Sequence, residues 1–300
     1  MDIGASYKAC RLCPRACGVD RTAGKTGVCH MGADPLVAHS MLHMWEEPCL
    51  SGRRGSGTVF FSGCPLGCVY CQNAKISRGG VGKKQDAASL ASLFLSLAER
   101  GAHNINLVTA THFAPHAVAA VAQARAAGLS IPIVWNTSGY ESAETLKMLE
   151  GTVDIYLTDF RYLKETTAQK YSSAANYPSV CENALAEMVR QTGAPVVDKE
   201  GLMRRGTIVR QLLLPTHLIE AKLILRKLFL TYGNDIYISL MSQYTPMQEC
   251  ASAYPELAST VSPSEYASLV EYACSLGVTQ AYIQEGGAAS ESFIPPFLED

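Results

Sequence analysis

From residue 58 onward, compact apolar segments alternate with longer segments whose apolar residues recur at helical spacing. The compact segments lack the polar–apolar alternation of a half-exposed strand, so they predict strands buried on both faces, as in a parallel sheet. This alternation indicates the α/β class. The predicted strands cover residues 58–62, 104–109, 132–136, 154–159, 207–213, 236–241 and 280–284.

A helix is predicted after each of the first six strands, and most of these helices end at a glycine, which readily adopts the left-handed stop. They cover residues 86–100, 116–127, 142–150, 179–192, 217–232 and 263–276. Repeated strand–helix units imply right-handed crossovers, which fit either an open doubly wound sheet or a closed or partial (β/α) barrel. In a barrel, functional residues follow the strands at their carboxyl ends.

Eight of the eleven cysteines lie within the first 71 residues. Disulfides of secreted proteins usually involve an even number of cysteines spread along the chain, so this odd and clustered set favours metal binding.

Three of these cysteines, Cys64, Cys68 and Cys71, follow the first predicted strand with the spacing Cys-x3-Cys-x2-Cys. Three thiolates on one short loop can hold three corners of an iron–sulfur cubane and leave the fourth iron without a protein ligand. An open metal position is typical of catalytic sites. The alternatives are a zinc loop with a distant fourth ligand, or three free thiols.

A second group, Cys10, Cys13, Cys17 and Cys29, lies in a segment rich in Arg and Gly. Four thiolates within 20 residues suit a structural zinc site or an additional iron–sulfur cluster, and His30 could replace one sulfur. A metal would supply folding energy that the few apolar residues do not. Free thiols are the alternative.

The loop Gly63 to Asn73 after the first strand of a βα array resembles the radical S-adenosylmethionine superfamily, and its flanking residues resemble the relatives of pyruvate formate-lyase activating enzyme. Within these relatives the chain is most similar to the PflX-like subgroup. Further matching segments are 10–21, 44–48, 240–246 and the terminal Ile294-Pro295-Pro296-Phe297.

The resemblance implies a partial (β/α)6 TIM-like barrel in residues 58–246. Residues 1–57 would form a cysteine-rich metal-binding module, and residues 247–300 a helix and strand extension that closes the barrel. A [4Fe-4S] cluster on Cys64, Cys68 and Cys71 would bind S-adenosylmethionine. Reductive cleavage would then yield a 5′-deoxyadenosyl radical that abstracts a hydrogen atom, an oxidoreductase chemistry carried out under anaerobic conditions.

Polar residues at the predicted strand ends are candidates for binding the S-adenosylmethionine. The resemblance places the methionyl ammonium near residues 109–111, although this chain has Thr109-Ala110-Thr111 where the family has Gly-Gly-Glu. Thr109 and Thr111 could equally serve strand propensity and helix capping. Arg210 stands in an apolar strand and needs a partner, which could be the cofactor carboxylate or Asp159. The full set is Tyr70, Thr109, Thr111, Asn136, Ser138, Asp159, Arg161, Arg210, Ser242 and Gln243, and His112 and Cys250 are the catalytic candidates.

His39 and His43 are four residues apart and precede Glu46 and Glu47. On a helix the two histidines would share a face, which would allow a di-histidine metal site. The interleaved Met41, Met44 and Trp45 favour an amphipathic docking face instead. The remaining cysteines, Cys49, Cys181, Cys250 and Cys274, are predicted to be small buried apolar residues.

The formal net charge of −2 does not favour a nucleic-acid-binding protein, and no apolar segment is long enough to span a membrane. The first residues lack a signal-peptide pattern, so a cytoplasmic protein is expected. Basic doublets at Arg53-Arg54, Lys83-Lys84 and Arg204-Arg205 could receive an acidic electron donor such as flavodoxin or ferredoxin.

Three functions are compatible with these features. The first is activation of a partner glycyl radical enzyme by hydrogen abstraction from a glycine. The second is radical modification of a small molecule or peptide. The third is a non-catalytic iron–sulfur electron carrier or metal-binding adaptor.

Overall fold

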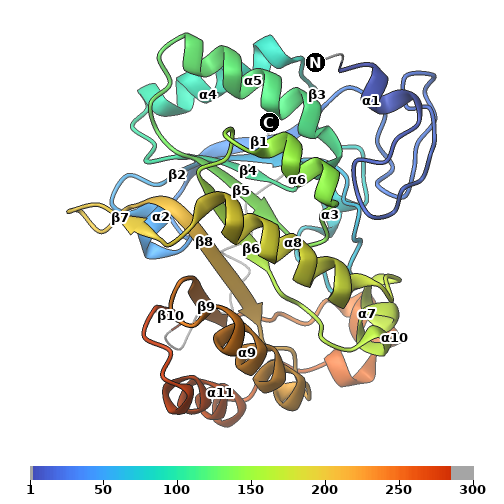
Figure 1. Cartoon of the computed structure of the whole chain (residues 1–300). Helices are drawn as coiled ribbons and strands as arrows, with labels where there is room; N and C mark the ends of the chain where they lie inside the picture. The colour runs from blue at the N-terminus through green and yellow to red at the C-terminus, as the bar shows by residue number, and fades with distance from the viewer. Residues whose placement is uncertain (1–2, 285–300) are drawn as a thin grey trace.

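The computed structural model describes residues 3–284, which form one curved sheet with helices on its outer side (Figure 1). The strand order is β10-β9-β8-β6-β5-β4-β2-β1-β3, with β7 paired to β8. All neighbours from β2 to β10 along this order are parallel. The strands are β1 (Leu36–His43), β2 (Ser56–Phe61), β3 (Lys83–Lys84), β4 (Ile105–Val108), β5 (Ile133–Thr137), β6 (Ile155–Asp159), β7 (Val196–Val197), β8 (Met203–Leu212), β9 (Tyr237–Met241) and β10 (Ala281–Ile283).

The α/β class and the mostly parallel sheet of a partial barrel are thus confirmed. Within residues 3–284 the sheet does not close on itself, because no pairing joins β10 to β3. Every predicted strand is present, with ends that differ by a few residues. The terminal segment 294–297 lies outside the described residues.

The N-terminal segment is less irregular than predicted. Residues 36–43 form β1, which pairs antiparallel with β2 over six positions from Val37–Phe61 to His43–Ser56. The prediction that His39 and His43 lie on a helix is therefore wrong. β1 has few fully buried residues, so the apolar-run signal that revealed the inner strands is absent.

The helices that follow the parallel strands cover one face of the sheet. In Figure 1, α4 and α5 lie together at the top, α8 crosses in front of the strands, and α9 and α11 lie below. α9 begins at Leu218, and no side-chain hydrogen bond caps its amino end. The helices are α1 (Ala5–Lys8), α2 (Pro48–Ser51), α3 (Ala74–Ser77), α4 (Ala87–Glu99), α5 (Ala114–Ala126), α6 (Ala143–Leu149), α7 (Glu165–Ser172), α8 (Tyr177–Thr192), α9 (Leu218–Tyr232), α10 (Gln248–Ala253) and α11 (Pro263–Leu276), with short 3-10 turns at Thr111–Phe113 and Pro255–Leu257.

The two faces of each inner strand bury different side chains, as the absence of polar alternation predicts. Trp135 of β5 packs outward against the helices, whereas its neighbour Val134 packs inward. The inward group also contains Cys49 and Leu50 of α2. The short helix α2 therefore fills the amino end of the barrel and leaves the carboxyl ends of the strands for a site.

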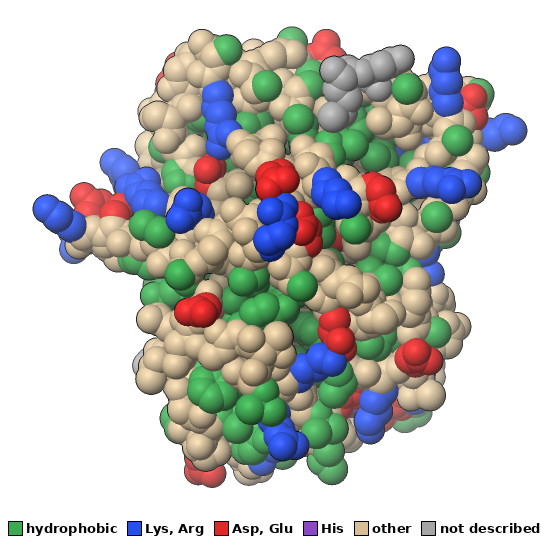
Figure 2. Space-filling model, in the orientation of Figure 1, with side chains coloured by type: hydrophobic (Ala, Val, Ile, Leu, Met, Phe, Trp, Pro, Cys, Tyr) green, Lys and Arg blue, Asp and Glu red, His purple; other side chains and the backbone are tan. Residues whose placement is uncertain are grey.

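Lys and Arg side chains are interspersed with Asp and Glu on the face shown in Figure 2. Several basic side chains extend from the projecting segment at the left, around β7, where Arg204 and Arg205 lie. None of the helices within residues 3–284 is both long enough and apolar enough to cross a bilayer.

Candidate functional site

The three-cysteine loop begins where β2 ends, at the carboxyl edge of the parallel strands. Gly63 makes the turn out of the strand with φ of +81°, a conformation that favours glycine. Burial and then the neighbouring Cys71 and Cys68 thiols raise the pKa of Cys64 to about 12. A bound cation would reverse this effect and favour the thiolates that ligate iron.

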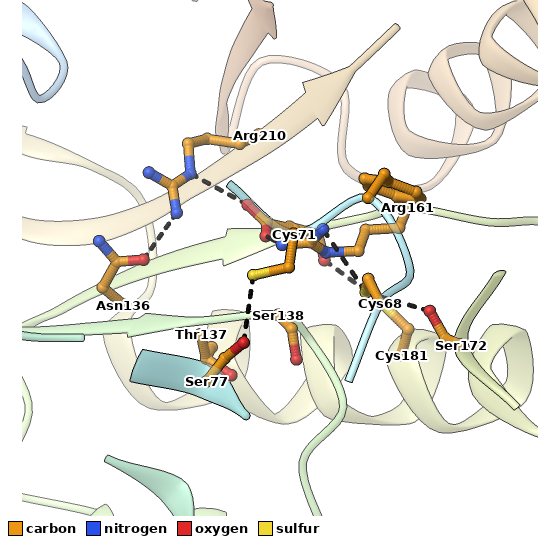
Figure 3. Close-up of polar contacts among 12 residues, drawn as sticks. Cys68, Cys71, Ser77, Asn136, Thr137, Ser138, Arg161, Ser172, Cys181 and Arg210 are labelled. Carbon is orange, nitrogen blue, oxygen red and sulfur yellow. Dashed lines mark hydrogen bonds and ion pairs between the residues drawn. The ribbon is translucent and has the colours of Figure 1, made fainter. Parts of the chain in front are cut away.

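Hydrogen-bond donors point at the sulfurs of this loop (Figure 3). The Ser172 hydroxyl donates to Cys68 Sγ at 3.0 Å, and the Ser77 hydroxyl donates to Cys71 Sγ at 3.5 Å. Arg161 Nη1 approaches Cys68 Sγ at 3.7 Å. Donors directed at ligand sulfurs stabilise their negative charge and tune cluster potentials, so the loop fits the predicted [4Fe-4S] cluster.

No group of three or more His, Cys, Asp or Glu side chains within residues 3–284 is arranged to hold a single metal ion. A cubane differs from a single ion because each thiolate ligates a different iron, so its ligands need not converge on one point.

Asp159, Arg161 and Arg210 form an ion-pair network. Figure 3 shows the two arginines beside Cys68 and Cys71 of the cysteine loop. Asp159 Oδ2 accepts from Arg161 Nη2 at 2.5 Å, and Asp159 Oδ1 accepts from Arg210 Nε at 3.0 Å. Burial alone would raise the pKa of Asp159, but the two guanidinium groups outweigh it and hold the pKa below its usual value. Arg210 therefore pairs with Asp159, one of the two partners that the sequence analysis considered.

Asn136 extends this network. Its Oδ1 accepts from Arg210 Nη2 at 2.6 Å, and its Nδ2 lies 3.4 Å from Glu46 Oε1. Ser138, in the turn after β5, contributes its backbone carbonyl oxygen to the Tyr177 hydroxyl at 2.8 Å.

The Thr109-Ala110-Thr111 element takes an unusual conformation. Thr109 has φ of +58°, and the Thr111 hydroxyl donates to Glu141 Oε1 at 2.6 Å. Glu141 is buried and also accepts from Thr137 and Trp135, while its Oε2 has no partner among the described residues. A carboxylate thus does lie beside this element, but it comes from the turn after β5, which sequence proximity does not reveal.

The two catalytic candidates are buried away from the pocket described below. His112 is 1% exposed, and its Nε2 lies 2.8 Å from the carbonyl oxygen of Ser62. Burial and the nearby Arg21 lower its pKa to about 3, so the ring is neutral. Cys250 is buried in the apolar cluster around α9 and α11. Cys49 and Cys181 are buried as predicted, whereas Cys274 is exposed and that prediction is wrong.

Three further residues that were predicted to bind the cofactor make hydrogen bonds within the protein. Tyr70 is buried, with its hydroxyl 2.7 Å from that of Tyr162. The backbone N–H of Ser242 donates to Gln284 Oε1 at 2.9 Å. Gln243 accepts through its carbonyl oxygen from Gln72 Nε2 at 2.9 Å, next to the cysteine loop.

A pocket of about 350 Å³ lies inside the barrel, between the α2 plug and the cysteine loop. Arg210, Asn136, Gln243 and two residues after Cys71 line it. The sequence interpretation missed Glu46, Glu47, Ser239 and Tyr282 as lining residues and assigned the two glutamates to an outer docking face. The signal that could have found the two glutamates is the Trp-Glu-Glu-Pro segment, in which two acidic residues precede a short helix without charged residues.

The N-terminal cysteines are held by backbone donors. Backbone N–H groups of Arg15, Val28 and Met31 bond to the sulfurs of Cys13, Cys17 and Cys29, respectively. Burial first, and then the neighbouring thiols, raises the pKa of Cys13 to about 12.

Arg21 lies at the base of this segment and is 2% exposed. Its guanidinium approaches Cys10 Sγ at 3.6 Å and donates to backbone carbonyl oxygens that include that of His112. Among the ion pairs of the described residues it has no carboxylate partner. Among the hydrogen-bond partners of Arg21 within the described residues, the Cys10 thiol is the group that can carry a negative charge.

Comparison with known proteins finds a family model that matches the central part of the chain. Residues 58–186 match the model of the radical SAM superfamily. An uncharacterized protein of Methanocaldococcus jannaschii is 27% identical over 260 residues, which cover 84% of this chain and 70% of that protein.

One solved structure, Streptococcus suis SuiB bound to precursor peptide SuiA, aligns with a TM-score of 0.49 and 9% identity over 79% of this chain. The chain spans half of the length of that protein.

Proposed function

Because residues 58–186 match the radical SAM superfamily model, we propose that this chain is a radical S-adenosylmethionine enzyme. Cys64, Cys68 and Cys71 would hold the [4Fe-4S] cluster. The single observation that carries this proposal is the loop itself, with the superfamily spacing, at the carboxyl edge of a parallel sheet, with hydroxyl donors on two of its sulfurs. When bound, the cluster and S-adenosylmethionine supply the 5′-deoxyadenosyl radical.

The chain's own residues would hold these groups. Ser172 and Ser77 stabilise the cluster thiolates by donating to them. Asp159 is kept ionised and can accept from a ribose or an ammonium group, while Arg161 and Arg210 can donate to a carboxylate.

The test is anaerobic reconstitution with iron and sulfide, followed by dithionite in the presence of S-adenosylmethionine. We expect 5′-deoxyadenosine and methionine as products. Cys68→Ala should abolish their formation, whereas Cys274→Ala, at an exposed cysteine, should leave it at the wild-type level. A fully loaded protein that forms no 5′-deoxyadenosine would overturn the proposal in favour of an electron carrier.

We propose first that the radical acts on a partner enzyme, because the chain resembles the activating enzymes and, within them, the PflX-like subgroup. In that case the chain abstracts a hydrogen atom from a glycine of a partner enzyme, with flavodoxin or ferredoxin as the electron donor. A glycyl radical signal in electron paramagnetic resonance spectra of a candidate partner would support this. The second candidate is radical chemistry on a small molecule or peptide, and the pocket of about 350 Å³ inside the barrel favours a small molecule.

We also propose that Cys10, Cys13, Cys17 and Cys29 bind a second metal. Supporting this are the backbone donors on three of the sulfurs and the buried Arg21 without a carboxylate partner in the described part of the chain. The thiols would have to move together for a single ion. Metal analysis of a variant lacking Cys64, Cys68 and Cys71 tests the idea. Zinc without iron would indicate a structural zinc site, and iron with sulfide would indicate a second cluster. The absence of any metal would indicate free thiols.

A further inference from the structure

The pocket inside the barrel has an acidic floor. The segment between β1 and α2 enters the barrel and places Glu46 and Glu47 beneath the strand residues Asn136, Arg210 and Ser239, all of which line the pocket. The opposite end reaches the residues that follow Cys71, so a molecule in this pocket would lie next to the cluster loop.

Glu46 has several partners. Its Oε1 accepts from Asn106 Nδ2 at 3.0 Å, and its Oε2 lies 3.4 Å from Arg210 Nη1. Its carboxylate is therefore satisfied by the protein itself.

Glu47 differs from its neighbour. It is 7% exposed, and its Oε2 has no hydrogen-bond partner within residues 3–284. The Ser239 hydroxyl bonds to its carboxyl group but carries no charge. A buried carboxyl group with an unsatisfied oxygen is costly unless a donor or a cation reaches it, and here the open side is the pocket.

The lining residues of the described chain include no cation to neutralise Glu47. Arg210 is the single Lys or Arg among them, and it already bonds to Asp159, Asn136 and Glu46. His43 also lines the pocket, but burial and then Arg210 lower its pKa, so its ring is not a cation near neutral pH. Three carboxyl groups, those of Glu46, Glu47 and Asp159, thus share two guanidinium groups, and a ligand cation that reached Glu47 would favour its ionised form.

We propose that the substrate of this pocket is a small molecule with a protonated amine, and that the amine binds Glu47 at the pocket floor. The aromatic rings of Trp45 and Tyr282 line the same pocket and suit a cation electrostatically. The volume of about 350 Å³ suits a compact molecule. This inference rests on the proposed function, since it names the substrate class for the same site.

Binding of two matched probes to the reconstituted holoprotein tests the inference by calorimetry. 5-Aminopentanol and pentane-1,5-diol have the same shape and differ by one ammonium group. We expect 5-aminopentanol to bind at least tenfold more tightly than the diol. Glu47→Gln should remove that preference, and Glu99→Gln, at an exposed residue of α4, should keep it. The wild-type comparison needs no variant, so a Glu47→Gln protein that failed to fold would not prevent the test.

The amine of S-adenosylmethionine itself is the main competitor for Glu47. We expect 5-aminopentanol to bind equally well with S-adenosylmethionine present at saturation. Competition between the two, or equal binding of both probes, would overturn the inference. Production of 5′-deoxyadenosine is measured separately. Cleavage without a preference for the amine would contradict only the proposed substrate class. A preference for the amine without cleavage would contradict only the proposed radical chemistry.

Discussion

Arg15 Nε donates a hydrogen bond of 2.9 Å to the carbonyl oxygen of Pro65, within the three-cysteine loop. The same guanidinium donates to the carbonyl oxygens of Leu66 at 3.1 Å and of Ser172 at 2.7 Å, and it lies over the Tyr140 ring. Arg15 itself lies between two N-terminal cysteines. One side chain therefore joins the N-terminal cysteine segment, the cluster loop and the end of α7.

We expect Arg15→Ala to lower the free energy of unfolding by about 2 kcal/mol, because hydrogen bonds to a charged donor each contribute roughly 1.5–3 kcal/mol and this site is partly exposed. The cluster should also be lost faster to an iron chelator. Arg15→Lys should not restore stability, since an ammonium cannot span the same carbonyl oxygens. Urea denaturation and the decay of cluster absorbance measure both effects.

The control for this substitution is Arg11→Ala, at an exposed arginine of the same segment. If Arg15→Ala and Arg11→Ala lose the cluster at the same rate, the contacts of Arg15 do not support the loop.

Two glycines of the cluster loop offer a second test. Gly63 and Gly67 both have positive φ, +81° and +67°. A Cβ on Gly63 would lie 2.6 Å from the carbonyl oxygen of Cys29, whereas one on Gly67 would meet nothing within 4 Å. Gly67→Ala should therefore cost about 1 kcal/mol of backbone strain, and Gly63→Ala clearly more because the N-terminal segment must also shift.

Thermal unfolding and iron content of the two variants are the measurements. Gly63→Ala should hold less iron than Gly67→Ala after the same reconstitution. Equal stability and equal iron content would show that the contact between Gly63 and Cys29 contributes nothing.

The parallel strands and their order along the chain could be predicted because their residues are buried on both faces and each is followed by a helix that ends at a glycine. The cysteine loop was predictable because its ligands are local in sequence. β1 was not, because most of its residues are only half-buried and carry no run of apolar side chains.

The pocket floor was unpredictable for a different reason. Glu46 reaches Arg210 and Asn136 only because the segment before α2 folds into the barrel from 90 or more residues away. In the same way Glu141 meets Thr111 across two strand ends. Motif spacing can reveal ligands that lie close together in the sequence. Contacts between distant segments become visible only when the fold is known.

Ser172 gives a prediction about the cluster's redox properties. Its hydroxyl donates to Cys68 Sγ at 3.0 Å and lies 2.8 Å from the Tyr162 hydroxyl. Removing a donor from a ligand sulfur destabilises the reduced, more negative state. Ser172→Ala should thus make the reduction potential more negative and slow reductive cleavage, at a stability cost of about 1 kcal/mol.

Redox titration monitored by electron paramagnetic resonance gives the potential directly. Ser173→Ala, at the neighbouring exposed serine, is the matched control and should leave the potential at the wild-type value. A potential unchanged in Ser172→Ala would mean that this hydroxyl does not interact with a cluster ligand.

The pH dependence of stability tests the charge state of Glu47. Burial, more than any other effect, raises the pKa of Glu47 above its ordinary value of 4.5, while Arg210 acts in the opposite direction. The folded state then holds a proton that the unfolded state has released, so above pH 4.5 this group's contribution to stability falls as pH rises. Glu47→Gln has no carboxyl group at this position, so its stability does not fall with pH for this reason. Relative to wild type, the variant should therefore become progressively more stable as pH rises from 4.5 through the raised pKa.

Urea denaturation at a series of pH values measures that difference, and Glu99→Gln should show no such trend. Glu46, Arg210 and His43 titrate or carry charge around the same pocket, but they are present in both proteins, so to first order their contributions cancel in the comparison. A stability difference between Glu47→Gln and wild type that stays constant with pH would mean that Glu47 is not kept protonated by burial. A bound amine should oppose the trend, because it favours the ionised carboxylate and so lowers the folded-state pKa.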